Sequence, residues 1–304
     1  MQDEERLVIG IGDIHGHVAA LNIILNALNK RYSIFKGSNL QLREGIELVA
    51  LGDYIDRGSS SIPTIETYRD LKEKNPEQMR LLLGNHEVIS LESLPCLRGL
   101  LSYPESMIRS EYRESSHGAN SGLKFVEEFD PDLKKAARVY CRRMSEDGDI
   151  GSWMRSLEPL HISQVNGKQI LFAHGGACND LQTRESLDKF RKSFSLKEAG
   201  ADGHQSQSDW LSWSAKQDSI FWSRRILSTS KPELEGILSK LAIDLIVFGH
   251  TPVSEITSYF DQAVNIDVGM SPKHGENEPA ALVIKPNEVM AFYALRGEEP
   301  LFTL

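Results

Sequence analysis

Five short apolar segments of this chain each end at an aspartate, asparagine or histidine that has a glycine beside it. The motifs are Gly12-Asp13-Ile14-His15-Gly16, Gly52-Asp53-Tyr54-Ile55-Asp56-Arg57-Gly58, Gly84-Asn85-His86-Glu87, His174-Gly175-Gly176 and Gly249-His250-Thr251. A glycine lets the backbone turn sharply at a strand end and gives a ligand close access. Sites in open α/β sheets gather at the carboxyl ends of the strands. The sequence therefore predicts an α/β fold in which these strand ends converge on one site.

The N-terminal part of the chain alternates between strand and helix patterns. Apolar, β-branched runs at 6–11, 46–51 and 79–83 predict three buried strands. Apolar positions at helical spacing predict a helix over 18–28, and a second helix is expected from about 59 to 73 because Pro63 suits a first turn. This β-α-β-α-β order indicates a largely parallel sheet.

The remainder of the chain divides into a polar helical stretch and further strands. Residues 95–158 are helical in pattern and short of β-branched runs, which predicts a helical insertion. Asn166-Gly167 is a strong two-residue turn signal and predicts a hairpin. Residues 244–249 predict another buried strand, and the short strands and turns of 255–295 are consistent with an antiparallel second sheet.

Charge and cysteine usage narrow the class of protein. The net charge of −9 argues against a general nucleic-acid binder, which needs a basic surface. Three cysteines without a CxxC pair are typical of reduced thiols. No signal-peptide pattern is present, and no apolar run approaches the roughly 20 residues of a membrane span. We therefore expect a cytoplasmic protein without nucleic-acid or membrane partners.

The motifs GDIHG, GDYIDRG and GNHE, with the two later histidines, resemble the calcineurin-like metallophosphoesterases, and among them the phosphoprotein phosphatase branch, over about residues 8–270. The resemblance implies an α/β (α+β) sandwich in which two mixed sheets pack face to face and are flanked by helices. It is expected to be a single domain over residues 1–304, with the helical insertion at about 95–158.

The resemblance also implies two divalent metal ions. Mixed carboxylate, amide and imidazole donors suit manganese, which we expect first, and iron or zinc as alternatives. The implied ligands are Asp13, His15 and Asp53 for the first ion, and Asp53, Asn85, His174 and His250 for the second. The Asp53 carboxylate would bridge the two ions.

Roles in catalysis follow from the same resemblance. A hydroxide bridging the two ions would attack phosphorus directly. His86 fits a general acid that protonates the leaving oxygen, and Asp56 would orient its imidazole. Arg57 offers a bidentate fork to the substrate phosphate, and Asn85 is a further phosphate-binding candidate. Arg224, or its neighbour Arg225, is the candidate for a second arginine that family members use.

Departures from related groups indicate the substrate class. Thr251-Pro252 follows His250, so the GHxH pattern of related nucleases and phosphodiesterases is absent. Diadenosine tetraphosphate hydrolases tend to show NRG and GNHD, whereas this chain has DRG and GNHE. LLLGNHE, FGHTP and NIDVGM look most like the Shewanella-like phosphatases, several of which prefer phosphotyrosine. We expect a phosphomonoesterase acting on phosphoproteins at phosphotyrosine, phosphoserine or phosphothreonine. The alternatives are a small-molecule phosphohydrolase, such as a dinucleoside polyphosphate hydrolase, and a catalytically silent binding module.

Several side chains with chemical potential lie outside these motifs. We expect surface or core positions for three histidines: His117, His161 and His204. Packing under a long loop is expected for three tryptophans: Trp210, Trp213 and Trp222. Lys273 and His274 are candidates for the border of the active-site mouth. Cys178 and Arg184 have the spacing of cysteine-dependent tyrosine phosphatases, but residues 179–183 contain no glycine to cradle a phosphate, which argues against that chemistry.

Overall fold

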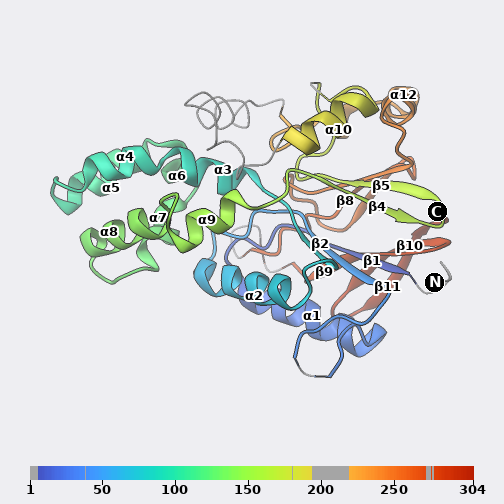
Figure 1. Cartoon of the computed structure of the whole chain (residues 1–304), viewed down its shortest axis with the longest axis horizontal. Coiled ribbons are helices and arrows are strands. Elements are labelled where there is room, and N and C mark those ends of the chain that lie inside the picture. The colour runs from blue at the N-terminus through green and yellow to red at the C-terminus, as the bar shows by residue number, and fades with distance from the viewer. Residues whose placement is uncertain (1–5, 38, 180, 194–218, 272–274, 276) are drawn as a thin grey trace.

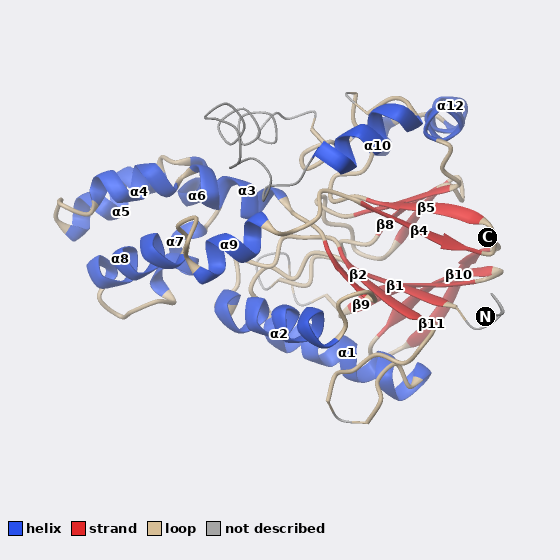
Figure 2. Cartoon of the chain, viewed as in Figure 1, coloured by secondary structure: helices blue, strands red, loops and turns tan. Residues whose placement is uncertain are grey.

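The computed structural model describes residues 6–37, 39–179, 181–193, 219–271, 275 and 277–304. Two β-sheets pack face to face, and helices cover their outer sides (Figures 1 and 2). This is the mixed two-sheet α/β sandwich that the sequence predicts. Among the described residues, no helix has both the length and the apolar character to cross a membrane.

The first sheet has six strands in the order β11-β10-β9-β1-β2-β3. Its strands are β1 (Leu7–Ile11), β2 (Ile46–Ala50), β3 (Met79–Leu81), β9 (Ala280–Lys285), β10 (Glu288–Tyr293) and β11 (Gly297–Phe302). β1, β2 and β3 pair in parallel, as their alternation with helices predicts. All five residues of β1 are buried, which fits a strand covered on both faces.

The second sheet has five strands in the order β4-β5-β6-β8-β7. Its strands are β4 (His161–Val165), β5 (Lys168–Phe172), β6 (Leu245–Phe248), β7 (Thr257–Tyr259) and β8 (Ala263–Asn265). β4 and β5 form the predicted hairpin, and Asn166 and Gly167 have φ of 48° and 76°, as a primed two-residue turn requires. β6 pairs in parallel with both β5 and β8.

The C-terminal strands do not form one antiparallel second sheet, so that expectation is wrong. β7 and β8 extend the second sheet, whereas β9, β10 and β11 extend the first. β9 pairs antiparallel with β1, with Val8 opposite Ile284. Both strands are apolar and almost entirely buried. Which distant strands pair depends on how the faces of the whole sheet are buried, and the local sequence does not determine it.

Helices flank both sheets. α1 (Val18–Tyr32) and α2 (Ser61–Lys74) lie outside the first sheet, and α10 (Arg184–Ser193) and α12 (Lys231–Leu241) lie outside the second (Figure 2). A run of helices, called here the helical insertion, extends from one end of the sandwich (left in Figure 1) within the stretch where the sequence predicts one. Its helices are α4 (Leu94–Leu100), α5 (Glu105–Arg113), α6 (Ser116–Ala119), α7 (Gly122–Glu127), α8 (Leu133–Arg143) and α9 (Asp149–Arg155). It follows α3 (Asn85–Glu92) directly.

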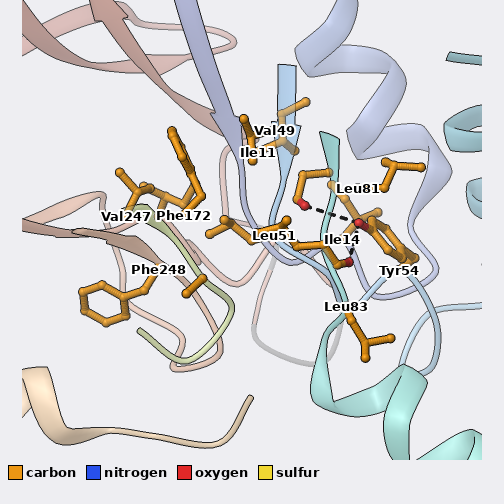
Figure 3. Packing of buried hydrophobic residues seen from close by; sticks show 14 of the residues in the cluster. Ile11, Ile14, Val49, Leu51, Tyr54, Leu81, Leu83, Phe172, Val247 and Phe248 are labelled. Carbon is orange, nitrogen blue, oxygen red and sulfur yellow. Dashed lines mark hydrogen bonds between the residues drawn. The ribbon is translucent and has the colours of Figure 1, made fainter. Parts of the chain in front are cut away.

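Apolar side chains of both sheets form one core beneath the strand ends. Figure 3 shows Ile11 and Val49 from the first sheet near Phe172 and Val247 from the second. Tyr54, which follows β2, donates a hydrogen bond to the carbonyl of Leu82 at 2.8 Å (Figure 3). This bond ties the loop after β2 to the segment after β3, so the two loops are fixed relative to each other.

A buried ion pair joins the two sheets near the start of β2. His161 Nε2 lies 2.7 Å from Glu47 Oε1, and Arg6 donates to Glu47 Oε2 at 3.0 Å. Burial alone would raise the pKa of Glu47, but the hydrogen bonds from His161 and Arg6 outweigh it and lower this pKa to about 2. Burial alone would lower the pKa of His161, but hydrogen bonds to Glu158 and Glu47 raise it.

Glu47→Ala should lower the free energy of unfolding by about 3 kcal/mol, because one partner of a buried pair is left behind. Glu47 stabilises the fold above its ordinary pKa of 4.5, and this contribution is lost as the pH falls toward 2. The contribution of His161 is complete below its ordinary pKa of 6.5 and is lost as the pH rises through its raised pKa. Denaturant unfolding should therefore show a larger difference between wild type and variant at about pH 5.5 than at about pH 9. A pH-independent difference would contradict the pair.

Candidate metal centre

The six predicted metal ligands all lie at the carboxyl ends of parallel strands. Asp13 and His15 follow β1, Asp53 follows β2, Asn85 follows β3, His174 follows β5 and His250 follows β6. All six side chains are buried. Because the two sheets pack face to face, strand ends from both contribute to the same site. The structure thus brings together residues that are separated by up to 237 positions, as the contact of the His250 amide with Asp13 shows.

The loops that carry these residues adopt strained backbone conformations. Positive φ values occur at His15 (48°), Asp53 (53°), Asp56 (69°), Arg57 (60°) and His250 (67°). Such conformations cost about 1–3 kcal/mol each outside glycine. They are held by the surrounding backbone, for example by the His15 amide, which donates to the Asp53 carbonyl at 2.8 Å.

Glu87 braces two of these loops from below. Its carboxylate accepts hydrogen bonds from the amides of Asp53 (2.9 Å), Tyr54 (2.9 Å) and Gly84 (3.0 Å). Burial, together with the nearby Asp53 carboxylate, raises the pKa of Glu87 to about 8. The glutamate of the GNHE motif therefore ties the loop that carries Asp53 to the loop that carries Asn85.

Asp53 lies between two histidines that face its two carboxylate oxygens. His15 Nε2 lies 3.4 Å from Oδ2, and His174 Nε2 lies 3.4 Å from Oδ1. The other ring nitrogens are fixed by backbone carbonyls, since His15 Nδ1 lies 3.0 Å from the Ile55 oxygen and His174 Nδ1 lies 3.0 Å from the Leu51 oxygen. Such contacts orient imidazoles that bind metal ions.

The polar atoms around His174 lie where a cation could bind. Its Nε2 lies 2.9 Å from Asn85 Oδ1, and His250 Nδ1 lies 2.9 Å from the same oxygen. Burial lowers the pKa of His174, and burial and then His174 lower the pKa of His250 to about 2. A neutral His174 has one N–H, so one of its nitrogens must turn a lone pair toward a carbonyl oxygen. A bound cation would accept these lone pairs together.

Buried polar atoms without partners give a second indication. Within the part of the chain that the structure describes, Asp13 Oδ1, His15 Nε2 and His250 Nε2 are buried and make no hydrogen bond. Burial, Asp267 and Asp53 together raise the pKa of Asp13. Burying such groups uncompensated is costly. Two metal-compatible groups are found among the described residues, and they share Asp53: His15, Asp53 and His86, and Asp53, His174 and His250. The donors fit two divalent ions.

His86 is the residue for which geometry allows two roles. Its Nδ1 lies 2.7 Å from Asp56 Oδ2, and its Nε2 lies 3.2 Å from Arg57 Nη2. A guanidinium beside Nε2 would repel a cation there, whereas it suits a nitrogen that faces an anionic substrate. The contact with Arg57 therefore favours a role for His86 toward the substrate, not as a metal ligand. Burial alone would raise the pKa of Asp56, but His117 and His86 lower it to about 2.

Arg224 lies beside the last ligand. Its Nε donates to Thr251 Oγ1 at 3.2 Å, and its side chain is exposed. The ring of the neighbouring Trp222 meets His250 edge to face, with centroids 5.6 Å apart. Arg224 is thus at the edge of the proposed second ion site, and its binding of phosphate stays a prediction. Arg225 instead donates to Asn179 at 2.7 Å.

Two residues near the site were not anticipated. Asp267 is buried beside Asp13 and follows β8, so the strand-end pattern that marks the predicted ligands was present there too. His117, expected at the surface or in the core, is buried, and its Nε2 lies 2.9 Å from Asp56 Oδ1. It belongs to no motif, so the sequence carries no signal for this contact. Five other candidates lie outside the described residues: Trp210, Trp213, His204, Lys273 and His274.

Comparison with known proteins finds relatives of this chain among phosphoesterases. The sequence model of the family described as calcineurin-like phosphoesterase matches residues 7–254. A serine/threonine-protein phosphatase of Caenorhabditis elegans is 23% identical over 256 residues, which cover 82% of this chain but 47% of that protein. A protein named Shewanella-like protein phosphatase 1, from Plasmodium berghei, is 26% identical over 313 residues, which cover 93% of this chain and 73% of that protein. This chain thus spans about half the length of the first relative.

Solved structures agree with the fold. A structure described as a cold-active protein tyrosine phosphatase superposes with a TM-score of 0.69 at 21% identity, over 97% of this chain and 78% of that one. A second, of a cold-active protein tyrosine phosphatase from a psychrophilic Shewanella species, gives a TM-score of 0.63 at 21% identity, over 97% and 80% of the two chains. At these identities the likeness establishes the fold alone.

Proposed function

The chain belongs to the calcineurin-like phosphoesterase family and is a metal-dependent phosphoesterase, and from that premise we propose that it is a phosphomonoesterase acting on phosphoproteins. The observation that carries the proposal is the pairing of His86 with both Asp56 and Arg57, next to a carboxylate shared by two groups of donors. The relatives named as protein phosphatases support the substrate class. We further propose that residues 1–304 form a single domain, because both sheets supply ligands.

We propose that Asp13, His15 and Asp53 hold the first ion and that Asp53, Asn85, His174 and His250 hold the second. Manganese is proposed first, with iron or zinc as alternatives, because imidazole and carboxylate donors suit these ions. When bound, two such ions activate water for attack and neutralise charge on phosphoryl oxygens. Asp53 faces one histidine with each of its oxygens, which suits a carboxylate shared between the two ions.

Arg57 and His86 are proposed to act on the substrate directly. In this structure the Arg57 guanidinium lies against His86 Nε2. A phosphate group binds a guanidinium more strongly than a neutral imidazole does, so the substrate would draw Arg57 away and leave Nε2 facing the leaving oxygen. Asp56 holds Nδ1 in place, and His86 can then carry a proton at Nε2 for the departing alkoxide or phenoxide.

The substrate class is tested by comparing two substrates with the purified, manganese-loaded protein. We expect kcat/KM for phosphotyrosine, phosphoserine or phosphothreonine peptides to exceed that for diadenosine tetraphosphate. Hydrolysis of the dinucleotide with no hydrolysis of any phosphopeptide would instead establish a small-molecule phosphohydrolase. Failure to hydrolyse all of them, the phosphopeptides, the dinucleotide and nitrophenyl phosphate, would contradict an enzymatic role.

Arg57→Ala should raise KM for nitrophenyl phosphate by about 10–100-fold, because a charge-assisted hydrogen bond contributes about 1.5–3 kcal/mol. Metal content should not change, since Arg57 is outside the proposed ligand set. The matched control is Arg109→Ala, which removes an exposed arginine of the helical insertion that pairs with Glu105 and Glu127. Steady-state kinetics with elemental analysis checks the result. Loss of metal in Arg57→Ala would show that this arginine supports the ion site and not the substrate.

A further inference from the structure

One buried carboxylate is held between two histidines from different parts of the fold. Asp56 Oδ2 lies 2.7 Å from His86 Nδ1, and Asp56 Oδ1 lies 2.9 Å from His117 Nε2. All three side chains have no exposed surface. His86 belongs to the sandwich, whereas His117 is supplied by α6 of the helical insertion. The insertion therefore reaches the residue that orients His86.

The hydrogen-bond partners fix the direction of both contacts. Tyr112 Oη lies 2.5 Å from His117 Nδ1, and Arg57 Nη2 lies 3.2 Å from His86 Nε2. The Arg57 guanidinium only donates, so His86 accepts at Nε2 and donates to Asp56 through Nδ1. Likewise, a His117 that donates to the Asp56 carboxylate through Nε2 accepts at Nδ1 from the Tyr112 hydroxyl. The two imidazoles thus donate to one carboxylate, one to each oxygen.

The surrounding chain is built for this position of the His117 ring. A Cβ atom on Gly122 would come within 2.3 Å of His117 Cδ2, so a larger residue there would displace the ring. The His117 amide donates to Ser93 Oγ at 3.2 Å. The absence of a side chain at Gly122 therefore leaves room for the ring, and the hydrogen bond to Ser93 holds the backbone of His117.

The helical insertion also holds the rest of the loop that carries Asp56. Lys124 Nζ donates to the Arg57 carbonyl at 2.9 Å. The two oxygens of Glu128 accept from the amides of Ser61 (2.7 Å) and Ile62 (2.8 Å), at the start of α2, where a negative charge is favourable. Together with His117, these contacts attach the insertion to residues 56–62 at several points. The helical insertion therefore supports the loop that carries Asp56 and Arg57.

We propose that His117 is a positioning residue for phosphate ester cleavage. It fixes Asp56 so that the carboxylate orients His86 toward the leaving oxygen of the substrate. This inference rests on the proposed role of His86 as the acid. It gives the helical insertion an indirect part in the reaction, through one hydrogen bond from His117 to Asp56.

The proposal predicts a defect that depends on the leaving group. Nitrophenolate leaves readily without a proton, whereas the phenolate of phenyl phosphate, with a pKa of about 10 like that of tyrosine, needs one. His117→Ala should lower kcat for phenyl phosphate by about 10–100-fold, as loss of such an orienting partner typically does. The loss for nitrophenyl phosphate should be much smaller, and KM and metal content should stay unchanged. His117→Gln, whose amide nitrogen can donate to Asp56, should recover most of the phenyl phosphate activity.

His161→Ala is the matched control. His161 is also a buried histidine with Nε2 2.7 Å from a carboxylate, Glu47, but it lies away from the site. This variant should lose stability without changing the ratio of the two kcat values. If His117→Ala lowers both activities equally, or if His117→Gln behaves like His117→Ala, the proposal is overturned.

A measurement on the metal-free protein tests the contact without turnover. The downfield proton resonance of His86 Nδ1–H, identified by its absence in His86→Ala, should shift or vanish in His117→Ala and persist in His161→Ala. An unchanged resonance in His117→Ala would overturn the proposal. Aryl phosphates are not proteins, so this test is independent of the substrate class. If the protein does not hydrolyse phosphopeptides but His117→Ala loses more kcat on phenyl phosphate than on nitrophenyl phosphate, only the phosphoprotein substrate is refuted. If wild type hydrolyses phosphopeptides but His117→Ala loses equal kcat on the two aryl phosphates, only the role of His117 is refuted.

Discussion

Asp53→Asn should remove both metal ions and lower kcat for nitrophenyl phosphate by about 10³-fold or more. Each oxygen of this carboxylate lies 3.4 Å from a different histidine, so its charge serves both proposed ion sites. The metal ions of such enzymes supply several kcal/mol of charge stabilisation in the transition state, and about 4 kcal/mol corresponds to a thousandfold change in rate. Elemental analysis of the purified variant and initial rates in the presence of manganese check both parts of this prediction.

Asp149→Asn is the matched control for this change. Asp149 is a half-exposed carboxylate of α9 that pairs with Arg143 and Arg69, away from the proposed ligands. The control should keep wild-type metal content and turnover. Two ions per chain and near wild-type turnover in Asp53→Asn would rule out a shared carboxylate.

His86→Ala should have the second largest effect, and its size should depend on the substrate. A positioned general acid contributes about 10²–10⁴-fold when the leaving group needs a proton. The serine alkoxide of a phosphoserine peptide is such a group, so kcat for this peptide should fall by about 10³-fold. Nitrophenyl phosphate has a much better leaving group and should lose far less. Parallel kinetics on the two substrates measures the difference.

Metal content distinguishes the two roles that geometry allows for His86. The nitrogen atoms of this ring lie close enough to Asp53 and His15 for His86 to be counted with them as a possible ligand group. If His86→Ala loses metal, His86 is a ligand and the acid must be sought elsewhere. If it keeps its metal but loses both activities equally, His86 is not the acid. If metal content is preserved and the losses are unequal, the acid role stands.

The location of the site was predictable because each of its residues lies in a short motif that the sequence shows by itself. Each of Asp13, Asp53, Asn85, His174 and His250 comes directly at the end of an apolar segment, and a parallel strand brings its carboxyl end to the same edge as its neighbours. The structure brings them together as this rule predicts. Asp267 follows a short strand in the same manner, so the pattern, applied to every strand, would have included it.

The parts that were missed depend on contacts between distant segments. No local feature of β9 indicates that it pairs with β1 and not with the strands that precede it. His117 meets Asp56 across 61 positions, from a short helix with no motif of its own. Its position follows from how the helical insertion packs on the loop after β2. Packing of this kind depends on the shapes of the whole surfaces that meet, so no short segment of the sequence predicts it.

The most direct test of the proposed centre is anomalous diffraction from crystals grown with manganese. The proposal predicts two peaks about 3.5–4 Å apart, one on each side of Asp53. His15 should contact one ion, and His174 and His250 the other. A single peak, or peaks that Asp53 does not contact, would contradict a two-metal centre built from these residues.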